Sequence, residues 1–251
     1  MAMDTIRSYA IRLGDDSLIL GHRLSEWCSR GPFLEEDLAL TNTALDYVGR
    51  ARMFYTYAAE LAADGTTEDT FAYQRDCRDF TNLLIYELPN GDFAFTMARQ
   101  YLSDEFSRLF MRSLSESSDE RLKGIAAKAV KESDYHLRRS REWMLRLGGG
   151  TVESHDRLQK AINDLWGYTS ELFLMDELER ELVAEGIAVN VEGLEDSWLM
   201  RVSATLAEGT LERPTGEWSV KGGRKGVHTE ALGHLLSDLQ FVQKSYPGFE
   251  W

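Results

Sequence analysis

A carboxylate and an imidazole interrupt an otherwise apolar helical stripe in the second half of the chain. The stripe is made by Leu122, Ile125, Ala129, Glu132, His136, Trp143 and Leu147. Glu132 and His136 are four residues apart, so they share one face of the helix and point toward whatever packs on it. Inward-facing carboxylates and histidines are the ligands of di-iron sites in helix bundles. The pair therefore raises the question of a metal centre.

Three further predicted helices carry an acid near an apolar face. Asp104 lies between Gln100 and Ser107 on a helix predicted over 93–116, and Asp46 lies beside the stripes of a helix predicted over 32–63. On the helix predicted over 4–29, His22 and Glu26 share a face. One carboxylate on each of four long helices is the arrangement from which a di-iron scaffold is built.

The ligand count nevertheless falls short of a di-iron centre. Such a centre takes a Glu-x-x-His motif from each of two helices, and this motif occurs nowhere in the sequence. The residue three before His136 is Ser133, and the run from Asp46 to Gly49 contains no histidine. The sequence favours a buried, hydrogen-bonded polar network in which the metal site is lost. The remnant ligand positions are Asp46, Asp104, Glu132 and His136.

Arginines near these stripes suggest what could replace a metal's charge. An interior guanidinium can neutralise a carboxylate and bond to it. The candidates are Arg23, Arg50, Arg52, Arg99 and Arg138. We expect ion pairs between them and the interior acids.

A compact basic loop occurs near the end of this acidic chain. It reads Lys221-Gly222-Gly223-Arg224-Lys225-Gly226 and lacks the spacing of a P-loop. Glycines expose backbone N–H groups that can bind anions, so Lys221, Arg224 and Lys225 are candidates for holding phosphates or a partner's acids. The alternative is an ordinary solvated connector.

Helical periodicity extends over almost the whole sequence and predicts the elements that position these residues. We find no alternating strand pattern. The helices are expected over 4–29, 32–63, 68–88, 93–116, 117–147, 153–185, 193–212 and 229–246. Ser117 and Glu120 suggest a capping box at the start of the fifth. Long helices with short connections predict an all-α bundle that forms one domain over residues 1–251.

The helix predicted over 32–63 carries two apolar stripes. One is Leu34, Leu38, Leu45, Val48 and Tyr55, and the other is Leu40, Ala44, Tyr47, Ala51, Phe54, Ala58 and Leu61. Two stripes predict neighbours on two sides of this helix.

Composition excludes several classes of function. The net charge of −14 opposes binding to nucleic acid and to anionic membranes. No segment has the apolar length of a membrane span, and the first sixteen residues lack the apolar core of a signal peptide. Cys28 and Cys77 form no metal or disulfide pattern and are expected to be buried thiols. These features predict a soluble cytoplasmic protein.

Several sequence blocks, in order, resemble the C subunits of bacterial phenylacetyl-CoA epoxidases. They are the runs 13–28, 35–40, 45–52, 87–93 and 98–101, the segment 131–138, the glycines 148–150 and the run 223–233. The similarity covers essentially the whole chain.

The resemblance implies a ferritin-like fold and a place in an oxygenase complex. In that family the di-iron centre belongs to the catalytic A subunit, and the C subunit pairs with it as a structural partner that has a degenerate site. The basic loop could then contact the A subunit or the phosphates of CoA. Isolated from its partner, such a chain is expected to form a homodimer.

Two other functions remain open at the level of sequence. One is a stand-alone di-iron oxidoreductase built on the same bundle. The other is a helical scaffold unrelated to oxygen chemistry, in which the inner acids are purely structural.

Overall fold

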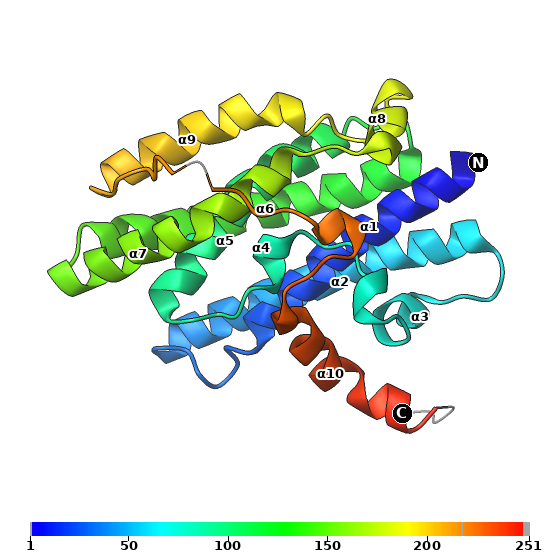
Figure 1. Cartoon of the computed structure of the whole chain (residues 1–251), viewed down its shortest axis with the longest axis horizontal. Helices are drawn as coiled ribbons and strands as arrows, with labels where there is room; N and C mark the ends of the chain where they lie inside the picture. Colours follow the sequence, from blue (N-terminus) through cyan, green and yellow to red (C-terminus); the bar gives the residue numbers. More distant parts are fainter. Residues whose placement is uncertain (1, 217, 248–251) are drawn as a thin grey trace. The chain divides into compact units, whose positions relative to one another are not determined.

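Two pairs of long antiparallel helices dominate the structure, a computed structural model that describes residues 2–216 and 218–247. One pair is α1 (Ala2–Ser25) with α2 (Leu34–Ala62), and the other is α5 (Phe93–Leu114) with α6 (Glu120–Gly148) (Figure 1). The chain divides into two compact units around these pairs. The α1–α2 unit comprises residues 1–89 and 222–251, and the α5–α6 unit comprises residues 90–221.

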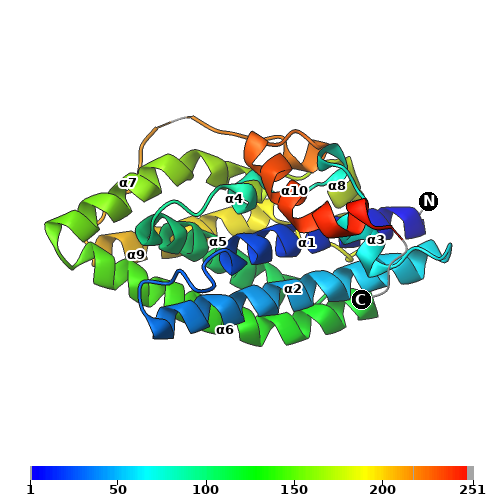
Figure 2. The same cartoon turned by 90° about the horizontal axis from the view of Figure 1, so that it is seen from below.

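The α1–α2 unit is completed by short elements from both ends of its sequence. After α2 come α3 (Glu68–Tyr73), a 3-10 turn at Cys77–Asp79 and α4 (Leu84–Glu87). The chain returns at a 3-10 turn, Gly223–Lys225, and ends in α10 (Glu230–Ser245), which packs on α3 (Figure 2). Gly14 lets α1 and α2 approach closely, because a Cβ there would lie 2.3 Å from the ring of Tyr55.

The α5–α6 unit adds three helices to its central pair. They are α7 (Val152–Thr169), α8 (Glu177–Ala184) and α9 (Glu195–Glu208), with 3-10 turns at Ser170–Phe173 and Glu192–Leu194. Asp92 starts α5 by accepting a 2.8 Å hydrogen bond from the Phe95 amide. Helix α9 contacts both α5 and α6, and the indole of Trp198 donates to the Leu102 carbonyl at 3.1 Å. The α5 helix is thereby fixed from two sides.

The predicted all-α fold class is confirmed, since the described residues contain helices and turns but no strand. Two predicted helices were too long. The segment 68–88 is broken after Tyr73, and the segment 153–185 is broken between Thr169 and Glu177. In the second case Asp176 forms a capping box with Glu179 and begins α8.

Other local predictions were also wrong. The N-cap of α6 is Asp119, whose carboxylate accepts from Arg121 N and Leu122 N. The Ser117 hydroxyl donates to the Ile187 carbonyl instead. Cys28 is exposed and Cys77 half-buried, so neither is a core thiol. Within the described residues, no helix is both long and apolar enough to cross a membrane.

Candidate functional site

The α5–α6 unit contains a seam of buried polar side chains where an apolar interface is expected. Gln100, Asp104 and Ser107 come from α5, and Ser133, His136 and Ser140 come from α6. All are at most 7% exposed. These residues recur at intervals of three or four, so each helix presents them on one face. We call this group the polar seam.

Asp104 is the acid of the polar seam, and it is fully buried. Its Oδ1 accepts from Gln100 Nε2 at 2.6 Å, and its Oδ2 accepts from Ser140 Oγ at 2.8 Å. Ser140 therefore connects α6 to α5 through the carboxylate. Burying a carboxylate costs free energy unless hydrogen-bond donors replace the lost water, so Gln100 and Ser140 compensate for the burial of Asp104.

A second contact across the polar seam joins two hydroxyls. Ser107 Oγ and Ser133 Oγ are 3.2 Å apart. Ser133 occupies the position at which a Glu-x-x-His motif ending at His136 would need its glutamate. His136 itself is 2% exposed, and Glu132 is half-buried one turn before it. A pair of hydroxyls thus lies where the glutamate of such a motif would be.

The polar seam does not fit a di-iron centre. Hard metal ions of that type are held by several carboxylates and histidines together. Among residues 2–216 and 218–247, no group of three or more histidines, cysteines or acids is arranged to hold a metal ion. Asp104 directs its two oxygens at neutral donors from Gln100 and Ser140. Asp46, the remaining remnant position, is half-buried on α2 in the α1–α2 unit.

The arginines proposed to neutralise the interior acids fall into two groups. Arg52 and Arg138 lie on the surface, Arg52 beside Glu68 and Arg138 over the ring of Tyr135. The prediction was therefore wrong for these two. Arg23, Arg50 and Arg99 are buried.

The buried arginines have specific polar or aromatic neighbours. Arg23 donates to the carbonyls of Glu87 and Ala231, at 2.9 and 2.8 Å. Arg50 lies over the ring of Tyr47, and Arg99 donates to Asn90.

A second polar cluster, which sequence reasoning did not identify as such, lies in the α1–α2 unit. Its centre is Glu87, which is fully buried. Glu87 Oε1 accepts from the Thr229 amide at 2.6 Å, and Oε2 accepts from Asn82 Nδ2 at 2.9 Å. His228 Nδ1 lies 2.7 Å from Oε2, and His228 Nε2 lies 2.8 Å from the Phe80 carbonyl.

Both ring nitrogens of His228 face acceptors, so the geometry favours the doubly protonated imidazolium. Burial alone lowers the pKa of His228. The hydrogen bonds to Glu87 and to the Phe80 carbonyl outweigh burial and raise the pKa above its ordinary value. The cluster thereby links the start of α10 to α4 through the His228–Glu87 ion pair and to the segment before α4 through the Phe80 carbonyl.

Two neighbouring acids of α1 organise the rest of this cluster. Asp15 accepts from Tyr55 Oη at 2.6 Å and from the amide and hydroxyl of Thr81, and it forms an ion pair with Arg75. Asp16 forms a two-pronged ion pair with Arg224, at 2.9 and 2.8 Å. Burial raises the pKa of Asp16, and the charge of Arg224 opposes that effect.

Residues 222–226 of the basic loop are tightly packed within the α1–α2 unit around Arg224. A Cβ on Gly223 would lie 2.1 Å from the Asn82 carbonyl, and one on Gly226 would lie 2.3 Å from the Arg78 carbonyl. Arg224 also donates to the Thr81 carbonyl at 2.7 Å. The glycines therefore allow close packing, Arg224 anchors the loop, and Lys221 and Lys225 are exposed.

The sequence did contain a signal for this second cluster. Asp15 and Asp16 stand directly between the apolar residues Leu13 and Leu18 of α1, where at least one acid must face the interior. The sequence could not show that Arg224, more than 200 residues away, is the ion-pair partner of Asp16.

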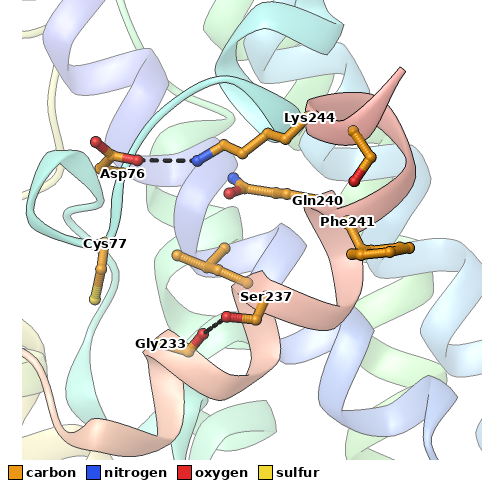
Figure 3. Close-up of a pocket in the computed structure, with 9 residues that line it drawn as sticks. Asp76, Cys77, Gly233, Ser237, Gln240, Phe241 and Lys244 are labelled. Atoms are coloured by element: carbon orange, nitrogen blue, oxygen red, sulfur yellow. Dashed lines mark hydrogen bonds and ion pairs between the residues drawn. The ribbon is translucent and has the colours of Figure 1, made fainter. Parts of the chain in front are cut away.

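A surface groove of about 530 Å³ lies between the Cys77–Asp79 turn and α10 (Figure 3). Its two charged residues form an ion pair, Lys244 Nζ to Asp76 Oδ1 at 2.9 Å. Gln240 donates both to the Ala72 carbonyl and to the Arg75 carbonyl. The polar groups of the groove thus serve to fix α10.

The fold and the polar seam define a long-helix protein in which ligand-type residues are buried and joined by hydrogen bonds between α5 and α6. The profile of the family described as phenylacetic acid catabolic protein matches residues 2–251. The C subunit of the 1,2-phenylacetyl-CoA epoxidase of Escherichia coli K12 is 49% identical over 249 residues, which cover 99% of this chain and 100% of the relative. The chain therefore belongs to the phenylacetic acid catabolic protein family.

Proposed function

We propose that this chain is the structural, non-catalytic C subunit of a multicomponent phenylacetyl-CoA epoxidase, and that it pairs with the di-iron catalytic A subunit in aerobic phenylacetate catabolism in the cytoplasm. The observation that carries the proposal is the 49% identity, over 99% of the chain, with a relative named as the C subunit of this enzyme. Because the similarity extends along the full length of both chains and is not confined to one helix or motif, it supports a shared role.

The chemistry of the polar seam supports a role without a metal centre in this chain. Asp104 is held by Gln100 and Ser140, and Ser133 contributes a hydroxyl where a ligand glutamate is needed. Hydroxyls and amides are weak ligands for iron beside carboxylate and imidazole. The arrangement supports a seam that stabilises the bundle, while the oxygen chemistry takes place in the partner.

The basic loop adds a narrower proposal. Lys221 and Lys225 are exposed and can attract phosphates of CoA or acids of the partner. Arg224, which is paired with Asp16, holds the loop in place. Neutralising both lysines should weaken such binding, while the Asp16–Arg224 pair keeps the loop folded.

The decisive test is iron content. The chain is purified alone and again after co-expression with the A subunit, and iron is measured per polypeptide. We expect no stoichiometric iron in the isolated chain and iron in the co-purified pair. Roughly two iron ions per isolated chain, the stoichiometry of a di-iron carboxylate centre, would instead establish the alternative, a stand-alone di-iron oxidoreductase.

A further inference from the structure

The outward face of α2 carries a row of exposed aliphatic side chains. Leu34, Leu38, Leu45 and Val48 are 70%, 54%, 63% and 37% exposed. They recur at helical spacing along one side, and we call them the α2 ridge. The other apolar stripe of α2 is buried, with Leu40 and Phe54 at 0%. Of the two apolar stripes of this helix, one is therefore buried, and the other is exposed at these four positions and buried only at Tyr55.

Gly49 marks a second unusual feature at the same place. It is exposed, lies in the helix beside Val48, and no atom lies within 4 Å of where its Cβ would be. Glycine weakens a helix interior relative to alanine, and no packing contact among the described residues requires it at this position. A gap beside a row of leucines is what a closely approaching helix needs. The ridge and the gap together fit a protein partner.

Charge decides which partner is favoured. The chain carries −14, so a second copy brings like charge to the contact. Glu35 is exposed beside the ridge, and the nearby Arg52 is already paired with Glu68 at 3.3 Å. The net charge of the chain and the exposed carboxylate of Glu35 therefore favour a partner helix with basic flanks.

We propose that the α2 ridge is the docking surface for another member of the epoxidase complex, the catalytic one. That partner provides a helix whose apolar stripe packs on Leu38 and Leu45, whose backbone approaches Gly49, and whose flanks carry Lys or Arg. This inference rests on the proposed function. A standard interface buries about 800 Å² on each side, so the ridge forms its apolar centre.

Two ridge variants test the proposal, each with a matched control. Leu45→Lys places a cation where the partner's basic flanks and apolar stripe approach, and Met200→Lys on α9 makes the same change at a side chain that is 64% exposed. Gly49→Leu fills the gap, and Gly124→Leu does so on α6, where a Cβ also has no neighbour within 4 Å. The Gly49 variant should melt at the same temperature as the wild type or higher, because leucine is the better helix former.

Affinity for the purified catalytic subunit is measured by calorimetry, with self-association followed by light scattering. We expect the two ridge variants to lose about 100-fold in affinity, as central interface residues do, and the controls to bind like the wild type. Ridge variants that bind the catalytic subunit normally would overturn the inference, whether or not they lose self-association. If the wild type itself does not bind the catalytic subunit, the proposed function fails first, and the two failures are thereby distinguished.

Discussion

At the scale of single residues, the interior acids are surrounded by donors of different kinds. Asp104 has neutral donors from Gln100 and Ser140, whereas Glu87 has an imidazole and a backbone amide. The first arrangement places neutral donors on both carboxylate oxygens, and the second places an ion pair in the core. Their responses to substitution and to pH should therefore differ.

Asp104→Asn should destabilise the chain by about 2 kcal/mol, because the new amide directs a donor at either Gln100 Nε2 or Ser140 Oγ. Urea unfolding followed by circular dichroism measures the change. The control is Asp134→Asn at the surface ion pair with Arg112, for which less than about 0.5 kcal/mol is expected. Equal effects at the two sites would contradict a structural role for the polar seam.

His228 should make stability depend on pH. Its pKa is raised in the folded state above the ordinary value of 6.5, so the stabilisation is fully present below that value and is lost as pH rises through the folded pKa. Unfolding free energies of wild type and His228→Gln are compared from pH 6 to pH 9. The difference should be about 2 kcal/mol at the acidic end and should shrink toward the alkaline end; a constant difference would argue against the imidazolium.

At the scale of elements, periodicity predicted the long helices well and failed where side chains bind backbone groups. The segment 68–88 has helical spacing, yet Asp15 binds the Thr81 amide and Asp16 binds the Leu83 amide. The Phe80 carbonyl faces His228. These backbone groups are thereby withdrawn from helical hydrogen bonding by residues distant in sequence, which no local pattern reveals. Local spacing was enough to recognise Asp104 as a remnant acid. It could not show that Ser140, which lies on another helix, is the hydrogen-bond partner of Asp104.

Gly223→Ala should disrupt the basic loop, because a Cβ would lie 2.1 Å from the Asn82 carbonyl and the obstacle is backbone. We expect a loss of about 2 kcal/mol or more and faster proteolysis between residues 221 and 229. Gly216→Ala, where the nearest atom to a Cβ is a side-chain carbon at 3.3 Å, is the milder comparison. Limited proteolysis with mass spectrometry locates the cleavage, and an undisturbed loop in the Gly223 variant would contradict the close packing.

At the scale of the whole molecule, the sequence predicted one domain, and the chain forms two compact units. We propose that they unfold together as one ferritin-like domain. Calorimetry of the isolated chain should then give one transition whose calorimetric and van't Hoff enthalpies agree. Two separable transitions, one of them shifted selectively by His228→Gln, would show that the units are independent.

The isolated chain offers a further check at this scale. We expect a homodimer when no partner is present, since a surface suited to a related protein can pair with its own copy. Raising the salt concentration should strengthen it by screening the repulsion between two chains of −14 each. Light scattering at low and high ionic strength measures both effects, and a monomer at every salt concentration would contradict the expectation.

The discontinuous make-up of the α1–α2 unit has a consequence for biosynthesis. Residues 90–221 are contiguous, so the whole α5–α6 unit has been translated before the C-terminal part of the α1–α2 unit is made. The α1–α2 unit is made first but lacks Arg224 and His228, the partners of Asp16 and Glu87, until the last part of the chain is translated. The half of the protein that is synthesised earliest is therefore completed last, and a premature stop after residue 221 would leave Asp16 and Glu87 without their cations.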